Sequence, residues 1–193
     1  MSGSQTRTRS WCVLGWWILA SLAGWAAGLA LGALLTMVGS KLFGLNEDRA
    51  LVYITMLSLG LACGAAQSTV LRGYLPGAWR WIPVTLAGYL LAVALIAAAN
   101  NARVAISDPI ALGLIGAAIG VSQWLLLRQY FRRTGFWVLA TAVGFLSFLW
   151  LVSNPASSLG EFIAVGTILG TLAAVAPGVV LAWVVRLPRD AIS

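Results

Sequence analysis

The sequence predicts an all-α membrane protein with six transmembrane helices, arranged as three helical hairpins of the same orientation. Three observations lead to this prediction: an apolar composition, six long charge-free windows and an internal repeat. Hydrophobic residues make up 61% of the 193-residue chain, and charged residues only 9%. A soluble domain carries about 25% charged residues, so this chain is suited to lipid rather than to water.

Charged residues divide the chain into six uncharged windows, at 10–40, 50–71, 81–102, 109–127, 134–160 and 162–185. A helix needs about 20 mainly apolar residues to cross a bilayer core, so each window holds one crossing. We therefore expect a short cytoplasmic arm at 1–10, a transmembrane domain at 11–187 and a cytoplasmic tail at 188–193. The predicted hairpins cover about 11–72, 80–128 and 135–186.

Local signals support these elements in chain order. The window at 10–40 is too long for the hydrophobic region of a signal peptide, so we expect it to stay as a membrane helix. The third helix should tolerate Pro83 in its first turn and end near Asn101. The fourth should begin at Ser107-Asp108-Pro109, a cap residue followed by an early proline. Asn154-Pro155 should separate the last two helices.

The loop charges predict the orientation. Nine of the 12 basic residues lie on the side of the N-terminus: Arg7, Arg9, Arg72, Arg80, Arg128, Arg132, Arg133, Arg186 and Arg189. The positive-inside rule then places both termini in the cytoplasm and the protein in the plasma (inner) membrane. The net charge of +7 is thereby explained by topology, and we expect no nucleic-acid partner. Seven tryptophans near the cytoplasmic boundary are expected to be interfacial anchors: Trp11, Trp16, Trp17, Trp79, Trp81, Trp137 and Trp183.

An internal repeat relates Gly60–Gly88 to Gly116–Gly144 at a constant offset of 56 residues. The even-numbered helices share Gly-x3-Gly-x2-Gln-x3-Leu-Arg, in which the glutamines are Gln67 and Gln123. The odd-numbered helices share an aromatic residue, then Ser or Thr, then Gly, then an aromatic residue, with Ser21, Thr85 and Thr141 as the hydroxyl positions. The sixth helix has Ala173 in place of the glutamine. A repeat of this length indicates three similar hairpins.

Positions i, i+4 and i+7 share one helix face, so the glycines, glutamines and hydroxyls of this repeat face neighbouring helices. Helices in lipid associate through small residues and through polar side chains that hydrogen-bond across the interface. Gln67, Thr85, Gln123, Thr141 and Ser21 are therefore candidates for packing contacts. The alternative is that they line a polar pocket or pathway.

Arg72 and Arg128 end the second and fourth helices and are expected to be topology anchors. A contact with anionic lipid or an acidic partner is the alternative, for which Arg128 together with Arg132 and Arg133 is the best candidate. Cys12 and Cys63 are expected to be small buried hydrophobes.

No Asp, Glu, Lys, Arg or His lies inside any window, and the whole chain has no His. Proton pumps and many transporters place ionisable groups in the membrane, and haem and metal sites need suitable ligands. We therefore expect no metal, no cofactor and no enzymatic activity.

The pattern Gly116-x3-Gly120-x2-Gln123-Trp124-x2-Leu127-Arg128, followed by Trp137-x3-Thr141-x2-Gly144, resembles a group of uncharacterised bacterial multi-pass membrane proteins. The similarity covers helices two to five well and the outer two loosely. It implies an inner-membrane protein and nothing catalytic. Size, helix count and termini are also generally similar to substrate-binding subunits of energy-coupling-factor vitamin transporters, without specific motif support.

The leading functional hypothesis is a non-enzymatic accessory, assembly or scaffold subunit that acts through helix packing, in the bilayer and with a protein partner or further copies of itself. The alternative is a small-solute binding or transport protein, uncoupled or driven by a partner complex, with a polar site near Gln67 and Gln123.

Overall fold

The computed structural model describes residues 3–43, 47–104, 107–131, 134–154 and 156–185, and every element assigned in them is a helix. Six spans are long and apolar enough to cross a membrane: Trp11–Leu42, Tyr53–Leu71, Ala78–Ala99, Asp108–Leu127, Phe136–Ser153 and Leu159–Val184. The predicted helical class and the count of six spans are confirmed.

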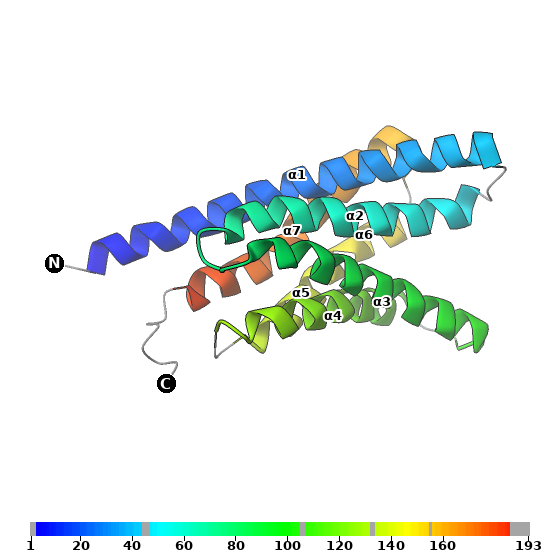
Figure 1. Ribbon diagram of the computed structural model, residues 1–193. Helices are drawn as coiled ribbons and strands as arrows, with labels where there is room; N and C mark the ends of the chain where they lie inside the picture. Colours follow the sequence, from blue (N-terminus) through cyan, green and yellow to red (C-terminus); the bar gives the residue numbers. More distant parts are fainter. Residues whose placement is uncertain (1–2, 44–46, 105–106, 132–133, 155, 186–193) are drawn as a thin grey trace.

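The helices follow one another as nearly antiparallel rods (Figure 1). In order they are α1 (Gly3–Phe43), α2 (Glu47–Leu71), the 3₁₀ helix η1 (Ala78–Arg80), α3 (Trp81–Asn101), α4 (Asp108–Leu127), α5 (Phe136–Phe145), the 3₁₀ turn η2 (Leu146–Phe148), α6 (Leu149–Ser153) and α7 (Leu159–Val184). One feature differs from expectation: a 3₁₀ turn interrupts the fifth span. The first helix begins at Gly3, within the predicted arm at 1–10, and its membrane span begins at Trp11.

Polar residues precede the two helix starts that the sequence predicted. Ser107 is extended and precedes α4, although its side chain makes no capping bond. At α7 the capping is complete: the Glu161 N–H donates to the Ser158 hydroxyl at 3.2 Å. The Glu161 carboxylate in turn accepts from the N–H of Ser157 at 2.7 Å. This reciprocal arrangement is a variant of the capping box, and it explains why the chain restarts as a helix after Asn154.

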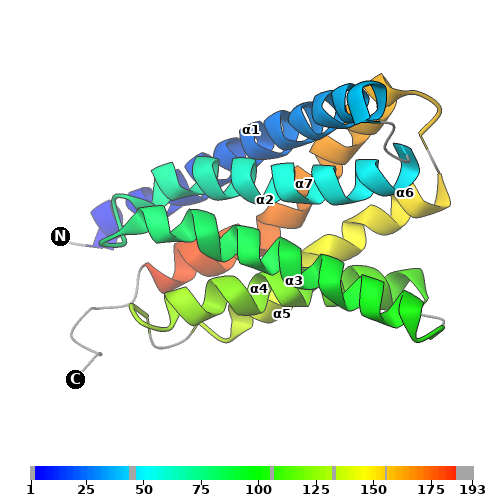
Figure 2. The ribbon, with the colours of Figure 1, turned by 45° about the vertical axis from the view of Figure 1, so that its right-hand side comes forward.

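The six spans form a closed ring. From α1 to α5, each helix packs against the one that follows it in the chain. The ring is then completed by α5 against α7 and by α7 against α1. Figures 1 and 2 show α7 running obliquely from one end of α1 to the opposite end of the bundle. Because the first and last spans are in contact, the ring encloses a central axis that all six spans face.

Glycines allow close approach at each of the six seams of the ring. Along the ring they are Gly24, Gly28, Gly32, Gly60, Gly64, Gly88, Gly116, Gly120, Gly144, Gly166, Gly170 and Gly178. At Gly88, a Cβ atom would lie 2.7 Å from the Cα of Ile119. Such a distance brings backbone against backbone, which is how small residues stabilise helix pairs in lipid. In α7 the glycines instead admit large side chains of α1, such as the Trp25 ring at Gly170.

The interior has two apolar clusters with a polar layer between them. One cluster surrounds Trp17, Trp81 and Trp137, and the other contains Trp25, Leu59 and similar residues. Between them lie the buried polar side chains Ser21, Gln67, Thr85, Gln123 and Thr141. The outer surface is covered by exposed leucines, valines and isoleucines. Such a distribution is typical of a protein whose solvent is lipid, and whose few polar groups must find partners inside.

Candidate functional site

Three tryptophans meet on the central axis, one from each of α1, α3 and α5. The ring centroids of Trp17 and Trp81 are 6.0 Å apart, those of Trp17 and Trp137 are 5.5 Å apart, and those of Trp81 and Trp137 are 5.7 Å apart. Each pair is nearly perpendicular, at 78°, 81° and 84°. This edge-to-face packing is the geometry that aromatic quadrupoles favour, and each such pair contributes about 0.5–1.5 kcal/mol beyond area burial.

The expectation that these three tryptophans are interfacial anchors is wrong, because Trp17, Trp81 and Trp137 are at most 1% exposed. Those that stay exposed are Trp11, Trp16, Trp79 and Trp183, as anchors should be. A signal was present in the sequence. Each buried Trp lies four residues before the Ser or Thr of its motif, and therefore shares a face with it.

The first glutamine connects three helices. The Nε2 of Gln67 on α2 donates to the Ser21 hydroxyl on α1 at 3.1 Å. Its Oε1 accepts from the indole Nε1–H of Trp81 on α3 at 3.0 Å. All three side chains are buried. An unpaired amide is costly in a hydrocarbon environment, so these two bonds hold α1, α2 and α3 in a fixed register.

The second glutamine makes corresponding contacts two helices further along the chain. The Nε2 of Gln123 on α4 donates to the Thr85 hydroxyl on α3 at 3.1 Å. Its Oε1 accepts from the indole Nε1–H of Trp137 on α5 at 2.9 Å. Sequence reasoning placed the Ser and Thr partners at the right depth, but it missed the tryptophans as donors.

On α7, Ala173 stands at the position that corresponds to the two glutamines, and the third tryptophan finds its acceptor elsewhere. The indole Nε1–H of Trp17 on α1 donates to the backbone carbonyl of Ala174 on α7 at 3.1 Å. Thr141, which was grouped with the glutamines, instead donates to the carbonyl of Trp137 on its own helix at 2.8 Å. The indole of Trp17 therefore closes the ring through main-chain atoms near Pro177.

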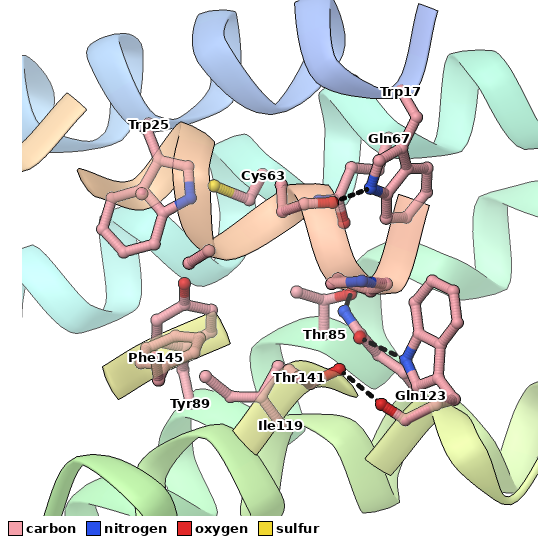
Figure 3. A pocket seen from close by; sticks show the side chains of 15 residues that line it. Trp17, Trp25, Cys63, Gln67, Thr85, Tyr89, Ile119, Gln123, Thr141 and Phe145 are labelled. Atoms are coloured by element: carbon pink, nitrogen blue, oxygen red, sulfur yellow. Dashed lines mark hydrogen bonds between the residues drawn. The ribbon is translucent and has the colours of Figure 1, made fainter. Parts of the chain in front are cut away.

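A cavity of about 40 Å³ lies beside this network. Figure 3 shows Trp25, Tyr89 and Phe145 on one side of it and Gln67, Thr85 and Gln123 on the other. Ala173 also contributes to its wall, and the missing third glutamine would extend from there. A water molecule needs about 10–15 Å³ of such volume and two or more polar partners, so the space suits a few waters rather than a solute.

Arg72, Arg80 and Arg128 lie at one end of the bundle. Arg72 and Arg128 are exposed, at the ends of α2 and α4. The guanidinium carbon of Arg128 lies 5.1 Å from the centroid of the Trp124 ring, and that of Arg80 lies 6.0 Å from the Trp79 ring. The loops at this end are tied together by Tyr130, whose hydroxyl donates to the Pro76 carbonyl at 3.0 Å. Arg132 and Arg133 lie outside the described residues.

The two cysteines differ. Cys63 is buried, as expected, beside Gly24 at the α1–α2 seam. Cys12 is exposed, so the expectation of burial is wrong for it: position 12 of α1 points away from the ring. Within the part of the chain that the structure describes, no three His, Cys, Asp or Glu side chains gather as metal ligands. Amides and hydroxyls at the centre can hydrogen-bond, but they are not general acids or bases near neutral pH.

Comparison of the chain with protein-family models, with curated proteins and with solved structures gave no match.

Proposed function

We propose that this protein is a non-enzymatic integral protein of the plasma (inner) membrane that acts as an accessory, assembly or scaffold subunit. It consists of three hairpin repeats of the same orientation, with both termini in the cytoplasm. Its rigid ring of helices offers lipid-exposed faces to a protein partner or to further copies of the same chain.

The closed hydrogen bonding of the two glutamines is the observation that supports this proposal most. Both side-chain amides of Gln67 and Gln123 have a donor and an acceptor partner within the ring. A binding or transport residue must exchange its partners with a solute. A glutamine that is already paired to a neighbouring Trp and Ser or Thr supports packing instead.

The repeated contacts support the hairpin description. The bonds of Gln67 recur at Gln123 with partners displaced from Ser21 to Thr85 and from Trp81 to Trp137. The exposed Arg72, Arg80 and Arg128 all lie at one end of the bundle, which agrees with the cytoplasmic assignment of that end from loop charge.

Exposed apolar faces of the spans support a role in binding another membrane protein. Two spans, Ala78–Ala99 and Phe136–Ser153, are the least buried. In the most apolar 18-residue stretch of each, only 22% of the residues are buried. Exposed side chains on these spans include Leu90, Leu91, Leu139 and Val143. Lipid alone can cover them, and so can a second transmembrane protein, which buries the same surface through close packing.

Solute binding near Gln67 and Gln123 is less well supported. Ligand pockets for small molecules have volumes of about 300–1,000 Å³, whereas the cavity beside the glutamines measures about 40 Å³.

Purification in a mild detergent followed by native mass spectrometry tests the proposal. We expect the chain to appear with a stoichiometric membrane-protein partner or with a second copy of itself. A monomer that retains a polar small molecule, and loses it when Gln67→Leu and Gln123→Leu are combined, would contradict the proposal. Gln129→Leu serves as the matched control, because Gln129 is exposed in the turn that follows α4, outside the polar layer.

A further inference from the structure

A second cavity, of about 150 Å³, lies on the central axis in the half of the bundle remote from Arg72, Arg80 and Arg128. Every spanning helix contributes to its wall. Leu29, Leu59, Leu112, Ile115, Phe148 and Phe162 are among the lining residues. All of its accessible wall atoms are apolar, in contrast to the smaller cavity beside the glutamines.

The chemistry of this wall disfavours water as the occupant, because the hydroxyl-bearing residues Thr55 and Tyr89 expose no polar atom to the cavity. A buried water needs two to four polar partners, and a cavity of about 150 Å³ lined by Leu, Ile and Phe stays dry but binds benzene or xenon. Hydrocarbon groups are therefore the ligands that this space favours. The rings of Trp25 and Phe148 lie at 31° to each other with centroids 5.0 Å apart, and they give the cavity wall an aromatic part.

The cavity lies at the depth where lipid chains end. Leu59 precedes the end of α2 at Leu71 by 12 residues, which is about 18 Å along a helix. Leu112 precedes the end of α4 at Leu127 by 15 residues, or about 22 Å. With Leu71 and Leu127 taken as the edge of a hydrocarbon core about 30 Å thick, the two positions lie about 3 and 7 Å beyond its centre, a depth that the terminal segments of acyl chains reach.

The two helices α6 and α7 pack against different neighbours beside the cavity. α6 packs against α4, whereas α7 packs against α1 and α5. Figures 1 and 2 show α6 and the first turns of α7 diverging toward the end of the bundle where α1 ends. Leu151 on α6 and Phe162 on α7 line the cavity and are only half-buried, whereas the Leu59 and Tyr89 wall opposite is fully buried.

We propose that this cavity binds the terminal segment of a phospholipid acyl chain, which enters from the bilayer between α6 and α7. The chain end fills a space that the protein's own side chains leave empty, and it contacts the aromatic surface of Trp25 and Phe148. This proposal is independent of the proposed function, because it uses neither the glutamines nor the orientation in the membrane.

Photolabelling of the full-length protein in phospholipid vesicles tests the proposal. The probe is a phosphatidylglycerol with a diazirine near the end of one acyl chain, and adducts are located by peptide mass spectrometry. We expect adducts on Met56, Phe148 or Phe162 of the cavity wall. Leu112→Phe places a ring into the cavity and should lower the yield of these adducts at least fivefold. Leu114→Phe, at an exposed position of the same helix, should leave it unchanged.

Toluene in the vesicles should also compete with the wall adducts, since it fits the same space. Adducts confined to outward-facing residues, or wall adducts with equal yield in Leu112→Phe and Leu114→Phe, would overturn the proposal. So would wall labelling by a free diazirine-bearing alkane but not by the phospholipid probe, because the ligand would then be a dissolved apolar molecule. Thermal melting of both variants verifies that they are folded.

Discussion

Individual hydrogen bonds at the centre of this protein have consequences that can be measured one side chain at a time. Gln123 accepts from Trp137 and donates to Thr85, so a single residue connects three helices. Interhelical hydrogen bonds in membranes are worth about 0.6–2 kcal/mol each. A buried donor that loses its partner adds a desolvation cost of about 1–3 kcal/mol.

Gln123→Leu should therefore destabilise the protein by about 1–3 kcal/mol, because it leaves the Trp137 indole N–H without an acceptor. Equilibrium unfolding in detergent measures the change. Combining it with Trp137→Phe should cost less than the sum of the two single changes, since Phe has no N–H left to satisfy. Gln129→Leu provides the control at an exposed position. Strict additivity of the two changes would disprove the hydrogen bond.

A glutamine introduced at position 173 tests whether a third side-chain amide can make the contacts that Gln67 and Gln123 make. Ala173 borders the cavity of about 40 Å³, near Trp17 and Thr141. Ala173→Gln should place an amide between these two side chains and reproduce the contacts of the other two glutamines. We expect Ala173→Gln to be more stable than the similarly sized Ala173→Leu by about 1 kcal/mol, as measured by thermal unfolding. Equal stability of the two variants would mean that the third position does not accept an amide.

At the scale of helices, backbone contact at the seams determines how the elements pack. Gly88 of α3 lies against the backbone of Ile119 in α4, with no flexible side-chain end that could move aside. Gly113 lies inside α4, and a Cβ atom there would meet nothing within 4 Å. The two glycines thus have different structural roles despite the same local conformation.

Gly88→Ala should lower stability by about 1–3 kcal/mol through overpacking, because α3 and α4 must separate to admit the methyl group. Gly113→Ala should be neutral or should stabilise its helix by up to about 1 kcal/mol. Thermal unfolding of both variants, side by side, measures the difference. Equal effects at the two positions would show that the α3–α4 seam is looser than described.

For the whole molecule, the decisive property is how the ring sits in the membrane. Gly73 lies in the loop after α2 at the arginine-rich end, and Ser107 lies at the opposite end before α4. Both are exposed. Their accessibility from either side of the membrane reports the orientation directly.

Single cysteines test this orientation on a background with Cys12→Ser and Cys63→Ala. With both termini in the cytoplasm, Ser107→Cys should react with a membrane-impermeant maleimide added to intact spheroplasts. Gly73→Cys should react only after permeabilisation. The reverse pattern would place the termini outside, and labelling of both sites in intact spheroplasts would indicate a mixed orientation.

Much of the architecture is determined locally along the chain, and it was predictable for that reason. The number and length of the spans depend on uncharged windows and on the thickness of hydrocarbon. The end of α3 near Asn101 and the start of α4 after Ser107 depend on short-range backbone preferences. The constant spacing of the two motif copies is a property of the sequence itself, as is the shared depth of Gln67 and Ser21.

The tertiary structure decided which tryptophans near the boundary are turned into the core, since hydropathy and depth treat them alike and only their spacing from the motif Ser or Thr hints at the difference. Trp16 and Trp17 have the same residue type and almost the same depth, yet the first is 65% exposed and the second 1%. Neighbouring positions on a helix point about 100° apart, so hydropathy and depth cannot distinguish them. The rotation is fixed by the close glycine seams and by hydrogen bonds between helices. Because of those contacts, Trp17, Trp81 and Trp137 lie at the centre of the core and not at the surface. The same packing leaves an apolar cavity on the axis, which no local pattern predicts.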